Sequence, residues 1–391
     1  MHNALMTCFI LLVFLSCGRE DKSVTVAWNG SDKEYLIHMD NVKDTLYPKL
    51  SDFAEDFEFI PLETKEECLV NRGEYFVTEK YILFKKRRFG ILQFDRSGRF
   101  IRTLARYGQG PNEYTRSGWT VDEKSQTLYM AASAKKNYFL RFNLNTGEYL
   151  GDLKKAMQGK STNIEFTPEN SLLVNPFAKF KEGENEYYLY EQDLSGELLK
   201  TFEAPAGWFN VSSGKNLFVF DGKARYELFD DGSIFTVKKN RLVPFISFDF
   251  GVTNTPDRVG YCSMIMEYET NDWVVLEKRS VVKIVDDIIY FESTNYIFDK
   301  KEEKVYHQGP IHFDPTHQGI YDGDNKSLSI QGNGIIHFVY QSIDFIDQAK
   351  KALEDDDFTE PYRFKLKRVA GLMTENDNPV VVVGRLLVEI K

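Results

Sequence analysis

The chain has 391 residues, 42% of them hydrophobic, which is enough to bury a sizeable core. Its formal net charge of −10 argues against a nucleic-acid partner, because phosphate contacts need clustered lysine and arginine. The one basic run, residues 85–88, has the composition of a solvated strand end.

The N-terminus has the pattern of an export signal. Residues 4–15 form an apolar run, interrupted only by Thr7 and Cys8, that is too short to span a bilayer as a helix. The run leads into Ser16-Cys17, which resembles the lipobox of bacterial lipoproteins, where cleavage before the cysteine leaves it as a lipidated N-terminus. An ordinary signal peptide and a buried core segment are the alternatives, since Phe14 replaces the usual Leu or Val and no Lys or Arg precedes the run.

Arg19-Glu20-Asp21 resembles the signal that sends Bacteroidota lipoproteins to the cell surface. We therefore expect a signal peptide at residues 1–16, a lipidated N-terminus and tether at 17–49, and a folded domain at 50–391. The expected location is the outer membrane, at the cell surface or otherwise in the periplasm.

Two cysteines remain once Cys8 leaves with the signal and Cys17 takes lipid. Cys68 and Cys262 form one disulfide in an oxidising envelope or stay buried and unpaired. The sequence has no Cys-x-x-Cys and no Cys/His spacing of a zinc site.

The folded part reads as strand after strand. Residues 57–63 predict an edge or closing strand, because Pro61 donates no backbone hydrogen bond. The hairpin at residues 94–100 places an aromatic residue on each side of a polar turn with glycine, and it recurs at 142–149, 192–198 and 229–234. The turn glycines at 98, 147, 196 and 232 are spaced by 49, 49 and 36 residues, the period of a propeller blade.

Two later units are weaker. A fifth is predicted from Val281 to Tyr306, with the turn at 299–303 lacking glycine, and a sixth from Leu328 to Val383. Residues 342–353 break the strand pattern with a helical apolar stripe after a possible Ser342 cap. We expect a helical insertion between strands of the last blade that packs on the rim or serves as a handle in a larger envelope complex.

The chain resembles the six-bladed β-propeller lipoproteins of Bacteroidota, which are relatives of NHL-repeat propellers. The resemblance covers residues 50–391 and is carried by residues 57–64, 94–100, 107–114 and 376–380. It implies an all-β fold of six four-stranded antiparallel blades. It also implies ring closure by pairing of residues 57–62 with the last blade.

The loop Tyr107-Gly-Gln-Gly-Pro-Asn-Glu-Tyr114 is the first candidate site. We expect it to connect the outer strand of one blade to the inner strand of the next, with Gln109, Asn112, Glu113 and Tyr114 available to a ligand. The alternative is a blade linker in which Glu113 and Tyr114 satisfy neighbouring backbone groups. The loop is no phosphate cradle, because no helix with a lysine follows it.

Other candidates have plainer explanations. His307, His312 and His317 are five residues apart among prolines, a loop spacing that does not favour a metal site, and Asp322–Asn325 predicts a hairpin turn rather than a calcium loop. Trp28, Trp119, Trp208 and Trp273 either line a glycan-binding face or pack between blades. No Ser-His-Asp order or nucleophile elbow is present, and we expect no cofactor and no metal.

These patterns favour a non-enzymatic envelope module that binds a small molecule, a glycan or an envelope protein and meets the membrane through its lipid anchor alone. The alternative is a metal-dependent lactonase- or lyase-type propeller enzyme, with a divalent ion held on the channel axis. That alternative rests on fold analogy.

Overall fold

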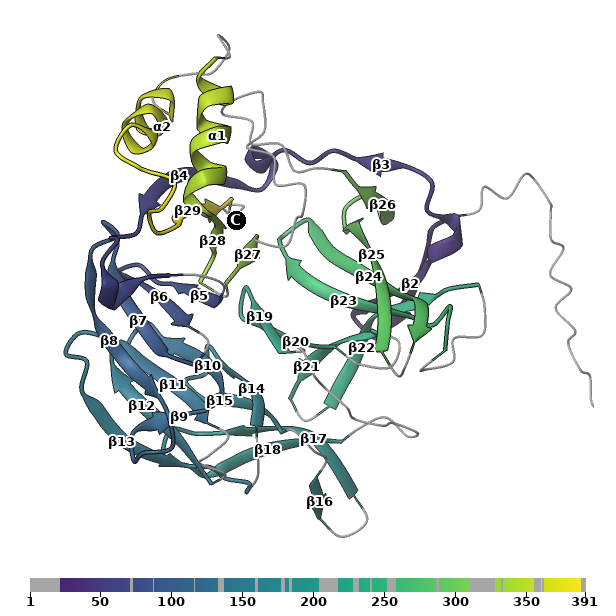
Figure 1. The fold of residues 1–391 in the computed structure, drawn as a ribbon. Coiled ribbons are helices and arrows are strands. Elements are labelled where there is room, and N and C mark those ends of the chain that lie inside the picture. The colour runs from purple at the N-terminus through teal and green to yellow at the C-terminus, as the bar shows by residue number, and fades with distance from the viewer. Residues whose placement is uncertain are drawn as a thin grey trace, which may run out of the picture.

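The computed structural model describes residues 22–70, 73–86, 88–115, 117–132, 137–158, 161–176, 180–182, 185–203, 217–227, 232–239, 241–251, 258–285, 288–309, 328–331, 333–354, 360 and 362–387. Their strands form six sheets set around a common centre, as in a β-propeller (Figure 1). The expected all-β propeller fold is confirmed.

Three sheets follow one another directly along the chain and are built from antiparallel hairpins, apart from one short strand of sheet 1 that pairs in parallel. Sheet 1 contains β5 (Gly73–Val77), β6 (Tyr81–Lys86), β7 (Gly90–Asp95), β8 (Phe100–Tyr107) and the short β9 (Glu113–Tyr114). Sheet 2 contains β10 (Ser117–Asp122), β11 (Thr127–Ala132), β12 (Tyr138–Asn143) and β13 (Tyr149–Lys154). Sheet 3 contains β14 (Ser161–Phe166), β15 (Leu172–Pro176), β16 (Phe180–Glu182), β17 (Asn185–Gln192) and β18 (Leu198–Glu203).

The other three sheets each include one or two strands from the N-terminal segment, residues 24–61. Sheet 4 contains β19 (Leu217–Phe220), β20 (Lys223–Glu227), β21 (Ile234–Lys238) and β22 (Arg241–Asp249), extended by β2 (Asp32–His38) and β1 (Val24–Asn29). Sheet 5 contains β23 (Cys262–Glu269), β24 (Trp273–Val285), β25 (Ile288–Asp299) and β26 (Lys304–Gln308), extended by β3 (Thr45–Leu46). Sheet 6 contains β27 (Ser329–Ile330), β28 (Ile335–Tyr340), β29 (Val380–Leu386) and β4 (Ala54–Pro61).

The N-terminal segment thus runs along the outer edges of three sheets. Strand β2 joins β22 in parallel, β3 joins β26 in parallel, and β4 joins β29 antiparallel. Short 3-10 turns interrupt it at η1 (Met39–Asn41), η2 (Leu50–Asp52) and η3 (Glu66–Cys68). The expected closure of the ring is confirmed, because β4 pairs with β29 in the last sheet. Pro61 lies opposite Val380 at the end of this edge strand, where a residue without an N–H is tolerated.

Part of the segment that we expected to be a tether is folded. Val24, Tyr35 and Ile37 are buried, and the Tyr35 ring centroid lies 4.7 Å from that of Phe298 in sheet 5. The alternation of apolar residues in β1 and β2 is the cause, since one side of each strand packs on the sheets. Folded structure therefore begins near residue 23 rather than near residue 50.

Apolar clusters of described residues connect every neighbouring pair of sheets. One cluster joins sheets 6 and 1 through Ile60, Phe84 and Val381, and another joins sheets 4 and 5 through Ile234, Met264 and Phe298. Further clusters lie between sheets 1 and 2, 2 and 3, 3 and 4, and 5 and 6. This packing between sheets is the main hydrophobic contribution to stability.

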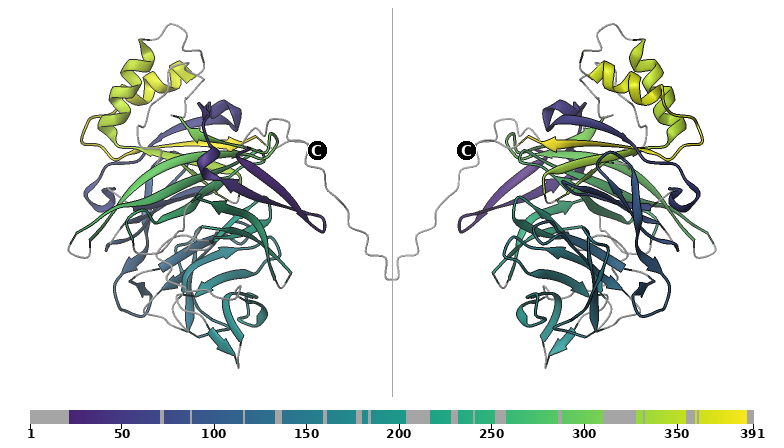
Figure 2. Two further views of the ribbon diagram at one scale, coloured as in Figure 1. Left: turned by 90° about the vertical axis from the view of Figure 1, so that its right-hand side faces the viewer. Right: turned by 90° about the vertical axis from the view of Figure 1, so that its left-hand side faces the viewer.

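The two ends of the strands differ. At one end, which we call the turn face, short turns connect the first strand of a sheet to the second and the third to the fourth. At the other end, which we call the loop face, lie the connections from the second strand to the third and from one sheet to the next. The loop face therefore carries residues 108–112, the end of the β24–β25 hairpin and the insertion between β28 and β29 (Figure 2).

The insertion contains the expected helix and one that we did not expect. Helix α1 (Ser342–Leu353) confirms the predicted helix, and α2 (Tyr362–Ala370) follows it. Ser342 is not the cap that we expected, because the N-cap is Gln341 and the Ser342 hydroxyl donates to the carbonyl oxygen of Glu375 at 2.7 Å. Phe345, Ala349 and Leu366 pack against the apolar side of sheet 6, so both helices are held on the propeller. No helix among the described residues is long and apolar enough to cross a membrane.

The hairpin repeat has a packing role that explains its glycines. Gly98, Gly147 and Gly196 occupy the turns between third and fourth strands, all with positive φ. A Cβ on Gly196 would lie 2.7 Å from the carbonyl oxygen of Lys154, in the outer strand of the preceding sheet. Gly232 is not equivalent, because it lies between the second and third strands of sheet 4, so our fourth copy of the repeat was wrong.

Sheet 5 shows how the repeat can lose its glycine. In its turn, Asp299 Oδ1 accepts hydrogen bonds from the N–H groups of Lys301 and Glu302 at 2.8 Å each. Glu303 adopts the positive φ of 53° that glycine would otherwise supply. The sheet also begins earlier than we expected, at β23, and its third strand is one continuous strand of 12 residues.

Candidate functional site

The loop at residues 108–112 joins β8 to β9 on the loop face and leads on to β10, the first strand of sheet 2, as expected. Strands β8 and β9 pair in parallel, Tyr107 with Tyr114. The N–H of Gly108 donates to the carbonyl oxygen of Tyr114 at 2.8 Å and closes the loop. The rings of Tyr107 and Tyr114 meet edge to face with centroids 6.0 Å apart, so the loop is compact.

The structure divides the four predicted ligand residues into two pairs. Gln109 and Asn112 are exposed to solvent. Glu113 instead turns back, and its Oε2 accepts a hydrogen bond from the N–H of Gly110 at 2.9 Å. The same carboxylate fills the space where a Cβ of Gly108 would stand, and Tyr114 is only 2% exposed. Glu113 and Tyr114 thus shape the loop, while Gln109 and Asn112 face outward.

Tyr114 lies near a charged cluster that we did not predict. Burial raises the pKa of its hydroxyl, with smaller contributions from Glu74 and Tyr107, and the hydroxyl has no hydrogen-bond partner among the described residues. Glu74 Oε2 accepts a hydrogen bond from Trp119 Nε1 at 3.0 Å and pairs with Lys85 Nζ at 2.6 Å. These contacts hold Trp119 between sheets 1 and 2.

The tryptophans do not gather on one described face. Trp273 donates from Nε1 to Asp299 Oδ2 at 3.0 Å and packs edge to face on Phe53. Trp28 is 66% exposed at the β1–β2 hairpin, beneath Lys33. Trp208 lies outside the described residues.

The histidine and cysteine candidates have structural surroundings. A ring nitrogen of His307 lies 3.3 Å from the carbonyl oxygen of Val42, and its ring packs on Tyr296, whereas His312, His317 and Asp322–Asn325 lie outside the described residues. Cys68 and Cys262 are buried thiols that form no disulfide with each other, and burial raises the pKa of the Cys68 thiol. Within the described residues, no group of three or more His, Cys, Asp or Glu side chains is placed to hold a metal ion.

A buried ion pair lies between sheets 4 and 5. Arg225 on β20 forms two hydrogen bonds with Glu269 on β23, with Nε to Oε2 at 2.8 Å and Nη2 to Oε1 at 2.9 Å. Lys300 Nζ reaches the same carboxylate at 3.1 Å. Burial favours the neutral acid, but the cations of Arg225 and Lys300 outweigh it and lower the pKa of Glu269. Arg225 and Glu269 are buried and Lys300 is partly exposed, and because the three groups join sheet 4 to sheet 5, we call them the latch.

Two other buried ionisable groups lie in the same kind of interface. Burial raises the pKa of Glu227 well above 4.5, although the N–H of Met266 donates to its Oε2 at 2.7 Å. Burial lowers the pKa of Lys155 to about 8, and its Nζ lies 5.0 Å from the centroid of the Phe139 ring. Lys155 is 1% exposed and Glu227 6%, so neither presents a reactive group to solvent.

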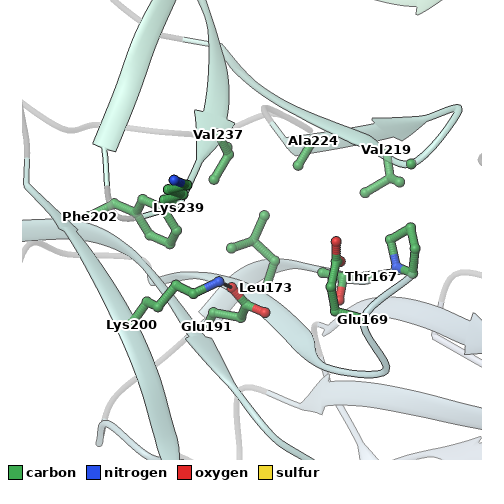
Figure 3. A pocket seen from close by; sticks show the side chains of 12 residues that line it. Thr167, Glu169, Leu173, Glu191, Lys200, Phe202, Val219, Ala224, Val237 and Lys239 are labelled. Atoms are coloured by element: carbon green, nitrogen blue, oxygen red, sulfur yellow. Dashed lines mark hydrogen bonds and ion pairs between the residues drawn. The ribbon is translucent and has the colours of Figure 1, made fainter.

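A small cavity of about 100 Å³ lies between sheets 3 and 4, toward the turn face (Figure 3). Apolar side chains of Leu173, Phe202, Val219, Ala224 and Val237 line it. Charged groups at its margin are Glu169, Glu191, Lys200 and Lys239. No sequence pattern pointed to this place, because its walls come from strands of two separate sheets.

The arrangement of sheets defines an all-β protein of the β-propeller type. The chain belongs to the family described as "Domain of unknown function (DUF4934)", whose profile matches residues 35–385. A comparison with curated proteins gave no match.

The fold is similar to that of a solved protein from Bacteroides fragilis, provisionally described as an exported protein. The TM-score is 0.63 at 17% identity, covering 90% of this chain and 100% of that chain. Two weaker likenesses are to the WD40 β-propeller domain of Doa1 (TM-score 0.38, 9% identity, 72% of this chain and 93% of that chain) and to a protein of unknown function from Bacteroides caccae (0.37, 10%, 67% and 82%). At 17% identity, the similarity to the Bacteroides fragilis protein supports the fold alone.

Proposed function

We propose that the protein is an exported, envelope-anchored propeller in which each of the six sheets is one blade, and that it binds a partner through its loop face without catalysing a reaction. The observation that carries this proposal is a group of exposed apolar side chains at the end of the β24–β25 hairpin. Ile288 is 58% exposed, Tyr290 48% and Phe291 52%. Exposed apolar groups that adjoin one another are typical of interaction sites.

The β24–β25 hairpin projects beyond the neighbouring strand β23 of its sheet. Strand β24 pairs with β23 as far as Ser280, and Val281 still exchanges backbone hydrogen bonds with Gly260 and Tyr261, so the end that pairs with β25 alone begins at Val282. Four residues of β24, at about 3.3 Å each, therefore extend the hairpin by roughly 13 Å. Val282 and Ile284 on β24 are also exposed, so apolar groups lie on both strands of the projection.

The helical insertion adds to the same face. Phe364 on α2 is 65% exposed, and Leu372 just after α2 is 76% exposed. Gln109 and Asn112 face solvent on the loop face too, and we retain them as candidate ligand contacts. Three connections on the loop face, namely the 108–112 loop, the β24–β25 hairpin and the helical insertion, thus carry exposed side chains that do not pack in the core.

We propose lipidation at Cys17 after removal of residues 1–16, with surface exposure directed by Arg19-Glu20-Asp21. Because the described fold begins near Ser23, only residues 18–22 remain as a tether, which reaches at most about 18 Å. The propeller would therefore lie close to the bilayer, and its partners would be found there.

Metabolic labelling with a fatty-acid probe tests the anchor. We expect label on the wild-type protein and none on Cys17→Ala. Equal labelling of the two proteins, or none on either, would remove the anchor from the proposal. Binding is tested separately by comparing partner capture by wild type, by a Tyr290→Ser/Phe364→Ser double variant and by Lys124→Gln on the turn face.

A further inference from the structure

The cavity between sheets 3 and 4 lies on the turn face, away from the loop face, so its role is independent of the partner surface above. The turn at Thr167–Ser171, the turn at Gly222 and Lys239 all contribute to its margin (Figure 3). Gly222 brings the backbone of sheet 4 close to sheet 3, since a Cβ there would lie 3.4 Å from Pro168 Cγ. These turns fix the width of the cavity.

One side of the cavity is a polar wall whose groups satisfy each other. Glu191 is 7% exposed; its Oε2 pairs with Lys200 Nζ at 3.0 Å, and its Oε1 accepts a hydrogen bond from Ser171 Oγ at 2.5 Å. The Ser171 and Thr167 hydroxyls lie 2.5 Å apart. A buried carboxylate that is paired in this way is held rigidly and adds little net charge.

Two further charged residues at the cavity margin, Glu169 and Lys239, differ from Glu191 and Lys200 in having no ionic partner among the described residues. Both are exposed to solvent, and within the part of the chain that the structure describes neither side chain takes part in an ion pair or hydrogen bond. Figure 3 shows them on opposite sides of the Leu173 side chain, Lys239 beside Phe202 and Val237, and Glu169 beside Thr167. The cavity thus offers one carboxylate and one ammonium group across an apolar floor.

We propose that this cavity binds a small aliphatic zwitterion, an amino acid whose ammonium group pairs with Glu169 and whose carboxylate pairs with Lys239. The apolar part of the ligand would lie on Leu173, Ala224 and Val237. Each charge-assisted hydrogen bond favours the ligand that carries the matching group.

The same charges disfavour other ligand classes. A simple anion would meet Glu169 without a cation to balance it, and a simple cation would meet Lys239. A purely apolar ligand would cover both charges without pairing them, which is costly. The volume of about 100 Å³ is smaller than an engineered cavity of roughly 150 Å³ that benzene fills, so only the short aliphatic part of the ligand would enter, and both charged ends would stay at the exposed margin beside Glu169 and Lys239.

Titration calorimetry tests this assignment on the chain from residue 17 carrying Cys17→Ser. The ligands are L-valine and 4-aminobutyrate, which separate their charges by a short and a long distance, with butyrate and butylamine as analogues carrying one charge. We expect saturable binding of at least one zwitterion and at least tenfold weaker binding of both analogues.

Three variants locate the site. Glu169→Gln and Lys239→Gln should each weaken binding of the zwitterion by roughly threefold to tenfold, the range expected for partly exposed charge pairs. Lys124→Gln, an exposed lysine on a turn of sheet 2, should leave binding unchanged. Thermal melts confirm that the three variants fold alike. Absence of saturable zwitterion binding, equal binding of a single-charge analogue, or indifference to both cavity variants would each overturn the proposal.

Discussion

The carbonyl oxygen of Pro61 fills the space that a Cβ of Gly98 would occupy. Pro61 ends the closing strand β4 in sheet 6, and Gly98 forms the tight turn between β7 and β8 in sheet 1. The N–H of Glu63 donates to the carbonyl oxygen of Gly98 at 2.8 Å. The first copy of the hairpin repeat is therefore also a contact across the junction that closes the ring.

Substitution of that glycine should open the junction. Gly98 has a φ of 83°, so alanine there is strained by about 1 kcal/mol and must also displace the Pro61 backbone. We expect Gly98→Ala to lower the free energy of unfolding by about 3 kcal/mol or more. Gly30→Ala is the matched control, since Gly30 has a φ of 67° with nothing near its Cβ position and should lose only about 1 kcal/mol. Equal losses in urea unfolding would contradict the contact.

The latch between sheets 4 and 5 gives a second prediction. Glu269→Gln leaves the buried Arg225 charge and the partly exposed Lys300 charge without their carboxylate, and we expect the free energy of unfolding to fall by about 3–5 kcal/mol. The control is Glu79→Gln, which breaks an exposed pair with Arg385 and should cost less than about 1 kcal/mol.

The pH dependence of the latch follows from the direction in which the pKa of Glu269 is shifted. Because the pKa of Glu269 is lowered in the folded state, its stabilising contribution is complete above the ordinary value of 4.5 and is lost as pH falls through the folded value. Wild type should therefore lose more stability than Glu269→Gln when urea unfolding is repeated below pH 4.5. Parallel pH profiles would argue against the ionised latch.

Glu227 should behave in the opposite way. Its pKa is raised by burial, so its contribution is complete below 4.5 and is lost as pH rises through the folded value. Glutamine keeps the acceptor for the Met266 N–H without a charge to bury. We expect Glu227→Gln to be more stable than wild type by about 1–2 kcal/mol at pH 8 and nearly equal to it at pH 4. If Glu227→Gln were less stable than wild type at both pH 8 and pH 4, the expected cost of burying the ionised carboxylate would be contradicted.

Sequence patterns predicted the parts of this fold that depend on local order. The alternation around Phe142 and the turn at Gly147 specify a hairpin without reference to the rest of the chain. The stripe from Ser342 to Leu353 specified α1 in the same way. The closing strand was predicted because Pro61 marks an edge and a propeller needs one strand to close it.

What could not be predicted depends on partners distant in the chain. Strand β2 pairs in parallel with β22, more than 200 residues later, and a short alternating strand does not indicate which edge it will join. Gly232 resembled the repeat by its neighbours, yet its turn lies at the other end of the sheet. The cavity could not be predicted for the same reason, because Lys239 and Glu169 line one cavity only when two sheets pack together.

Photocrosslinking in the living cell tests most directly whether the loop face binds a partner. A photoreactive amino acid is placed in turn at Tyr290 and Phe364 on the loop face, and at Lys124 on the turn face as the control. We predict that both loop-face positions give the same discrete adduct and that Lys124 does not. Adducts that are equally strong from all three positions, or from none, would contradict the assignment of this face as the binding surface.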